Sequence, residues 1–130
     1  MVRGRKVALG LVALGLLAAA ALAEGASLQG TAGPDVLLGT PRDDTLAGLG
    51  GADRLRGRAG ADRLRGGRGR DRLAGGAGFD SLRGGSGRDL IRAWDRTPDT
   101  IDCGPGRDTV RAGSVEDGVY NCERVLEPRP

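Results

Sequence analysis

Aliphatic residues recur at every ninth position through the middle of the chain, each with mostly polar or charged neighbours. A nine-residue period does not fit an α-helix, because at 100° per residue successive aliphatic side chains would fall on opposite faces. It fits short strands of about three residues whose middle side chain points inward, joined by turns of about six residues. The pattern therefore predicts one strand around each of Leu37, Leu46, Leu55, Leu64, Leu73, Leu82 and Ile91.

Two more columns keep the same period. A glycine begins each unit, five positions before an aspartate, and a second glycine stands two positions before that aspartate in every unit except the one with Arg42. Glycine at this density disfavours a helix and suits turns that need positive φ or close backbone contact. The aspartates, each two residues before its aliphatic residue, are Asp35, Asp44, Asp53, Asp62, Asp71, Asp80 and Asp89.

Two nine-residue units make one coil of 18 residues, so the predicted fold is an all-β solenoid of nine-residue half-coils over residues 30–92, with two short parallel sheets joined by glycine turns. Aspartates 18 residues apart then stack in two ladders, and carboxylates one strand spacing (about 4.8 Å) apart repel by roughly 1 kcal/mol per neighbour even in water. A dication between them reverses the sign of that term. Calcium fits better than magnesium because it accepts six to eight oxygens in flexible geometry, and about 3 to 5 ions are expected.

Composition narrows the function classes. The chain has 25 glycines among 130 residues, 2% aromatic residues and no histidine. Catalysis that needs histidine and metal sites built on histidine are excluded, and repeated aspartates in a slender solenoid offer no cleft for a catalytic pair, so no enzyme is expected. The aliphatic column is also thin for a core, which predicts a largely disordered chain without metal.

Residues 1–23 have the pattern of a secretory signal peptide. Arg3, Arg5 and Lys6 precede an apolar run, and Ala21-Leu22-Ala23 is a small-x-small cleavage site. The alternative is an uncleaved membrane anchor, since the run reaches the short limit for spanning a bilayer. Cleavage after Ala23 would leave a secreted, extracellular protein without stable membrane insertion, with a short linker over residues 24–29. It would remove three of the 20 basic residues and none of the 17 acidic ones, leaving a net charge near zero.

The complete units GGRGRDRLA, GGAGFDSLR and GGSGRDLIR, from Gly66 to Arg92, resemble the glycine-rich nonapeptide of the haemolysin-type, or repeats-in-toxin (RTX), calcium-binding family. The resemblance implies a parallel β-roll that binds Ca²⁺ between successive coils through turn aspartates and turn carbonyl groups. Besides the seven aspartates, the metal-site residues implied are Gly67, Gly69, Gly76, Gly78, Gly85 and Gly87.

Residues 93–130 have a different rhythm and are expected to form a small cap with two more strands, with Asp108 and Asp117 again nine residues apart. Export would place Cys103 and Cys122 in an oxidising compartment, where two cysteines in a small chain usually pair. The segment also resembles a tail of secreted bacterial RTX proteins, in which a CGxG cysteine precedes a CE cysteine. We expect this disulfide to staple the cap.

Arginines flank the inward leucines and should therefore cover the outer faces of both sheets. They indicate either a solvated, edge-protecting surface or a module that binds an anionic cell-surface polymer, with calcium structural. A cell-surface stalk is a further alternative. An arginine-glycine nucleic-acid binder is disfavoured by the fixed columns and by the lack of aromatic residues for base stacking. The arginines are Arg54, Arg56, Arg63, Arg65, Arg72, Arg83 and Arg92.

Overall fold

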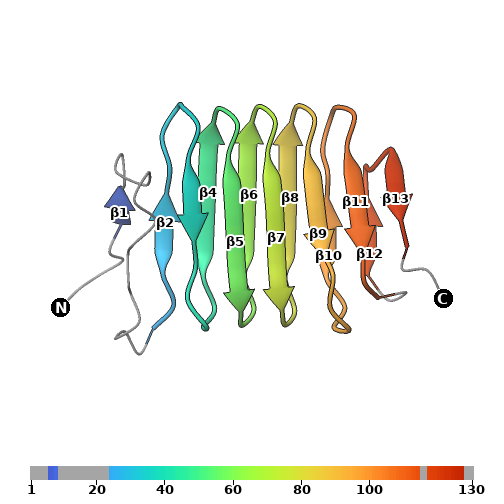
Figure 1. Ribbon diagram of the computed structural model, residues 1–130, viewed down its shortest axis with the longest axis horizontal. Helices are drawn as coiled ribbons and strands as arrows, with labels where there is room; N and C mark the ends of the chain where they lie inside the picture. The colour runs from blue at the N-terminus through green and yellow to red at the C-terminus, as the bar shows by residue number, and fades with distance from the viewer. Residues whose placement is uncertain (1–5, 9–23, 115–116, 128–130) are drawn as a thin grey trace.

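The computed structural model describes residues 6–8, 24–114 and 117–127. These residues form short strands joined by turns, with no helix, and the strands wind from one end of a flattened solenoid to the other (Figure 1). Apart from residues 6–8, the predicted signal segment lies outside the described residues, as does its cleavage site. No helix in the described part of the chain is long and apolar enough to cross a membrane.

The strands are three to six residues long. They are β1 (Lys6–Ala8), β2 (Ser27–Gln29), β3 (Val36–Leu38), β4 (Thr45–Gly50), β5 (Arg54–Ala59), β6 (Arg63–Arg68), β7 (Arg72–Ala77), β8 (Ser81–Ser86), β9 (Leu90–Ala93), β10 (Thr100–Asp102), β11 (Thr109–Ala112), β12 (Gly118–Tyr120) and β13 (Arg124–Leu126).

From β2 onward consecutive strands belong to opposite sheets, and all pairings are parallel. Among the described residues, sheet A has the order β1-β2-β4-β6-β8-β10-β12 and sheet B the order β13-β11-β9-β7-β5-β3. In the repeat region each residue pairs with the residue 18 positions later, as Leu46 does with Leu64 and Leu64 with Leu82. This register confirms the predicted parallel β-roll, because two nine-residue units complete one coil.

The core is the predicted aliphatic column. Every member from Leu37 to Ile91 is at most 2% exposed, and the column extends beyond both ends of the repeat, to Leu28 before it and to Ile101 and Val110 after it. Residues on either side of each core leucine are exposed or partly exposed, as in β5, where Arg54 and Arg56 flank Leu55. Each strand from β2 to β8 therefore contributes one aliphatic side chain to a narrow two-sheet core, and β9 and β11 each add a buried alanine.

The turns need backbone conformations that favour glycine. Gly67 has φ 105°, and a Cβ there would collide with the carbonyl of Leu49 in the preceding coil. Leu49 pairs with Gly67 and takes positive φ itself, at 78°, without being glycine. The stacked turn therefore imposes this conformation even on a leucine, although left-handed backbone costs an L-residue roughly 1–2 kcal/mol.

The segment after the repeat continues the same two sheets. The offset between stacked aspartates rises from 18 to 19 where Asp80 meets Asp99 and Asp89 meets Asp108, because the turn between β9 and β10 has one extra residue. Strands β10 and β11 pair with β8 and β9 in this shifted register. A disulfide joins Cys103, just after β10, to Cys122, between β12 and β13, as predicted.

We predict that replacing both cysteines by alanine lowers the free energy of unfolding by about 3 kcal/mol, because the bridge closes a loop of 19-residue separation. Alanine suits position 103, which lies two residues after the core residue Ile101. The corresponding buried positions after Ile91 and Val110 are already alanines, Ala93 and Ala112. Thermal unfolding of the calcium-saturated wild type and double variant measures the difference. Equal midpoints would show that the bridge does not restrain the unfolded chain.

Candidate metal centre

Nine aspartates occupy equivalent buried positions, each immediately before the first residue of a strand. Their side chains are at most 7% exposed, and Asp71 is fully buried. The group comprises the seven predicted residues together with Asp99 and Asp108: Asp35, Asp44, Asp53, Asp62, Asp71, Asp80, Asp89, Asp99 and Asp108. Buried carboxylates at this density require partners, because an uncompensated charge in an apolar setting is costly.

One carboxylate oxygen of each stacked aspartate has a backbone partner. The Asp53 amide donates to Oδ1 of Asp71 at 2.9 Å, and the Asp71 amide donates to Oδ1 of Asp89 at 2.9 Å. The second ladder repeats the contact, with the Asp62 amide 2.9 Å from Oδ1 of Asp80. The two predicted ladders therefore form, and the amide in each gap offsets part of the repulsion that the sequence predicts.

The other carboxylate oxygen lacks a partner through the middle of both ladders. Oδ2 is buried and makes no hydrogen bond in seven of the described aspartates. We call this set the orphan aspartates: Asp53, Asp62, Asp71, Asp80, Asp89, Asp99 and Asp108.

The aspartates at the ends of the ladders differ from the orphan aspartates. The amide of Thr40, four residues before Asp44, donates to Oδ2 of Asp44 at 2.6 Å, and the hydroxyl of Thr40 donates to Oδ1 at 2.9 Å. In Asp35 the amide and the hydroxyl of Thr31 both donate to Oδ2. At the other end, Oδ2 of Asp117 accepts hydrogen bonds from the amides of Gly113 and Ser114. In all three carboxylates Oδ2 is therefore satisfied within its own turn.

Whether Oδ2 finds a donor depends on the backbone conformation of the residue four positions before the aspartate. Where that residue has positive φ, as Arg58 and Gly76 do, its amide makes no bond to Oδ2 of Asp62 or Asp80. Where it does not, as at Thr40, the amide reaches the carboxylate. The orphan oxygen is thus a consequence of the glycine turn, and only Asp99, which follows the lengthened turn, falls outside this rule.

The glycines that the sequence places in the metal site lie in these turns. All six have positive φ, between 98° and 131°. Carbonyls of one coil face glycines of the next, since a Cβ on Gly85 would strike the carbonyl of Gly67, and one on Gly87 the carbonyl of Gly69. Gly76 and Gly78 face the carbonyls of Arg58 and Gly60 in the same way. The turns therefore bring backbone oxygens into the space between successive coils.

The first glycine of each unit leaves room for the carboxylate. A Cβ on Gly66 would meet Oδ2 of Asp71 and, at 2.6 Å, the carbonyl oxygen of Gly84. An orphan oxygen and a carbonyl of the next coil therefore lie against the same glycine. In the C-terminal coils Ala93, Cys103 and Ala112 are buried at equivalent positions.

Burial raises the pKa of the orphan aspartates. It is the largest cause, the amide hydrogen bond opposes it, and neighbouring carboxylates such as Asp71 beside Asp53 raise the pKa further. The pKa is about 6 for Asp53 and Asp80, and about 7 for Asp62, Asp89 and Asp99. Near neutral pH, the metal-free chain therefore holds buried carboxylates that are only partly ionised.

The sequence of this region matches the family of the RTX calcium-binding nonapeptide repeat (4 copies), over residues 38–73 and 65–95. Residues 38–95 of the chain are therefore RTX repeats. No curated protein and no solved structure matches it.

The donors in these RTX repeats fit calcium. Unpaired carboxylate and backbone carbonyl oxygens are the hard ligands that Ca²⁺ prefers, and its flexible coordination tolerates a mixed set. Among the described residues, no three Asp, Glu or Cys side chains converge on one point. A cation between two coils would therefore depend on turn carbonyls as well as on carboxylates.

Sequence reasoning did not place Asp99 in the ladder of the RTX repeats. The extra residue in the preceding turn breaks the nine-residue count, although Asp99 and Asp108 are themselves nine residues apart. A search for the same period on each side of a one-residue insertion would have found both. Sequence reasoning also missed the distinction between aspartates with and without a partner for Oδ2, since that depends on peptide orientation.

We predict that the metal-free protein is more stable at about pH 5 than at about pH 8. The raised pKa values mean that the folded state binds more protons than the unfolded state between pH 4 and 7, so the free energy of unfolding falls as pH rises through this window. Circular dichroism in chelator from pH 5 to pH 8 measures the folded fraction, with urea titrations at each pH where the chain is folded. Stability that rises with pH would contradict the assignment.

Proposed function

We propose that the protein is a secreted calcium-binding β-roll in which Ca²⁺, held between stacked glycine-rich turns, drives folding. The orphan Oδ2 atoms carry the proposal. Each is a buried carboxylate oxygen without a donor, and a cation supplies the missing positive charge. The chain's RTX repeats and the backbone oxygens between its coils support the same conclusion.

The proposed ligands are the orphan aspartates and the carbonyls of Gly67, Gly69, Gly76, Gly78, Gly85 and Gly87. Asp44 already has donors for both oxygens, and Oδ2 of Asp35 accepts the amide and the hydroxyl of Thr31. The part of these two aspartates is therefore to close the N-terminal turns of the ladders through Thr40 and Thr31. When bound, calcium supplies charge neutralisation and no chemical step. The repeated aspartates form ladders rather than a pair facing a cleft, and we assign the protein no catalytic activity.

Export accords with this function. The disulfide Cys103–Cys122 suits an oxidising compartment, and the extracellular medium supplies calcium at millimolar levels, where weak sites fill. We propose that residues 1–23 are a signal peptide cleaved after Ala23. Folding would then wait until the chain meets calcium outside the cell.

We predict that the mature chain is largely disordered in chelator at pH 7.5 and gains β-structure on adding calcium. A site with a dissociation constant near 10⁻⁴ M contributes about 1.4 kcal/mol at 1 mM calcium, and several such sites together match the stability of a typical domain. Circular dichroism titrated with CaCl₂ and then with chelator measures the transition, with MgCl₂ as the control. An identical spectrum in chelator and in calcium would end the proposal.

Two isosteric variants separate ligand aspartates from structural ones. Asp71→Asn removes the charge at an orphan oxygen while keeping an acceptor for the Asp53 amide. We expect it to raise the calcium concentration at the folding midpoint, with a loss near 1.4 kcal/mol per abolished site at 1 mM calcium. The metal-free variant should fold at least as well as the wild type, because a buried charge is gone.

Asp44→Asn is the matched control. Its new amide group would face either the Thr40 amide or the donors at Oδ1, so a buried donor loses its acceptor at a cost of about 1–3 kcal/mol. We expect this loss to be the same with calcium and with magnesium. If Asp44→Asn weakened the calcium response as much as Asp71→Asn, the division between orphan and hydrogen-bonded aspartates would be wrong.

A further inference from the structure

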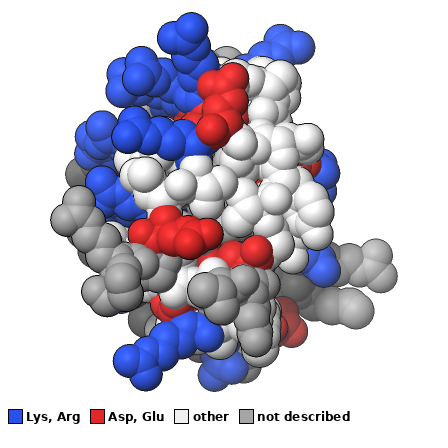
Figure 2. All heavy atoms as spheres, turned by 90° about the vertical axis from the view of Figure 1, so that its right-hand side faces the viewer, with Lys and Arg blue, Asp and Glu red and all other residues white. Residues whose placement is uncertain are grey.

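The outer faces of the two sheets carry different charge. The described strands of sheet B contain no aspartate or glutamate, whereas β10 of sheet A contains Asp102, which forms a salt bridge with Arg83 at 3.4 Å. The exposed arginines flanking the core positions of sheet B are Arg54, Arg56, Arg72, Arg92, Arg111 and Arg124, which we call the sheet B arginines. Basic side chains also stand out at the C-terminal end of the solenoid (Figure 2).

The sheet B arginines face one another without an intervening acid. Arg54 pairs in register with Arg72, and Arg92 with Arg111, on strands about 4.8 Å apart. Like charges directly opposite on neighbouring strands destabilise a sheet. Among the described residues these arginines have no salt-bridge partner. Their positive charge is therefore available to an external anion.

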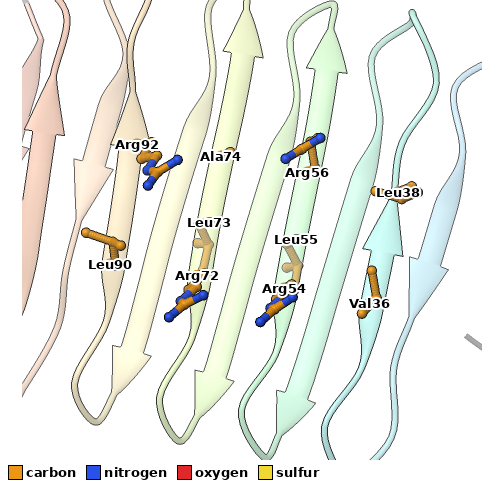
Figure 3. Close-up of a pocket in the computed structure, with 10 residues that line it drawn as sticks. All are labelled: Val36, Leu38, Arg54, Leu55, Arg56, Arg72, Leu73, Ala74, Leu90 and Arg92. Atoms are coloured by element: carbon orange, nitrogen blue, oxygen red, sulfur yellow. The ribbon is translucent and has the colours of Figure 1, made fainter. Parts of the chain in front are cut away.

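A shallow groove lies among four of these arginines. It has a volume of about 460 Å³, and Arg54 and Arg72 line one side while Arg56 and Arg92 line the other (Figure 3). Residues two apart on a strand are about 6.6 Å apart, so the two rows run side by side across the strands, along the axis of the solenoid. The groove is open and elongated, which suits a linear chain better than a compact molecule.

The groove offers almost nothing but donors and aliphatic surface. Guanidinium groups donate hydrogen bonds and cannot accept them. The other residues that line the groove are Val36, Leu38, Ala74 and Leu90, together with Leu55 and Leu73, whose side chains are buried in the core. None of them has a polar side-chain atom, so a hydroxyl-rich sugar chain would find no side-chain acceptor there, and nucleic-acid bases would find no aromatic ring for stacking. Phosphate oxygens accept paired guanidinium bonds.

We propose that the sheet B groove binds a linear polymer of polyol phosphodiesters, which carries no bases, with its phosphates between the two arginine rows. This goes beyond calcium binding and rests on the proposed function only in requiring the calcium-folded state. Sheet B is the more basic face, because its described strands carry more arginines and no acid, whereas those of sheet A carry fewer arginines together with Asp102. The protein would then be a calcium-dependent module for phosphate-rich surface polymers.

The test uses a fluorescent decamer of glycerol phosphate and the mature chain, with free calcium held constant in excess and circular dichroism confirming the fold. The variant Arg54→Gln/Arg72→Gln/Arg92→Gln removes three charges from sheet B. The control Arg63→Gln/Arg65→Gln/Arg68→Gln removes three exposed charges from β6 of sheet A. We expect the sheet B variant to lose at least tenfold in affinity and to show a salt-dependence slope shallower by about 2, with the control near wild type.

Folded wild-type protein that does not bind the decamer in low salt would overturn the inference while leaving calcium-driven folding intact. Equal losses in the two variants would show a general charge effect and overturn it as well. Tighter binding of hyaluronate or of single-stranded DNA of matched charge would reassign the surface to another class of polymer. Protein that stays unfolded in calcium would instead contradict the proposed function.

Discussion

A buried carboxylate with one satisfied oxygen and one unsatisfied oxygen is the constraint on which this structure depends. The solenoid needs an aspartate in each turn because its Oδ1 accepts the amide of the stacked aspartate, which closes the backbone hydrogen-bonding between coils. The same placement removes Oδ2 from water. Since burial of the charged form is the dominant cause of the raised pKa values, each coil adds a destabilising charge along with its hydrogen bonds. A proton or a cation at the orphan oxygen resolves the conflict.

The two ends of the ladders resolve the same conflict without an ion. Thr31 and Thr40 supply amide and hydroxyl donors at the start, and the turn amides of Gly113 and Ser114 serve Asp117 at the finish. The disulfide lies near the finish as well. The ends of a solenoid have neighbours on one side only and gain least from stacking. Contacts that do not need a metal ion therefore stabilise the chain where stacking stabilises it least. Metal dependence is concentrated in the middle coils, where stacking occurs on both sides.

The fold follows closely from the sequence, because a strict nine-residue period fixes both the inward column and the 18-residue register. Leu55, for example, must face the core once Leu37 and Leu73 do, and the sheet pairing confirms this. The cysteine pairing was also predictable, from the expected compartment and the resemblance of the tail. Which aspartates lack a donor was not, because Thr40 and Arg58 differ there in φ and in the direction of an amide, which composition does not encode. The place of Asp99 was hidden by one inserted residue.

The nine-residue repeat also separates opposite charges in space. Aspartates occupy the turns, and arginines occupy the strand positions beside the core. The mature chain, although its expected net charge is near zero, therefore has negative charge along its turns and positive charge on the faces of its sheets. Each calcium ion adds two positive charges in the turns and leaves the arginines of the sheets unchanged, so loading turns a nearly neutral chain into a cationic solenoid. On the function proposed here, the ion that drives folding also strengthens the attraction of the surface for polyanions. A single ligand would then control both the formation of the binding face and the net charge of the molecule that carries it.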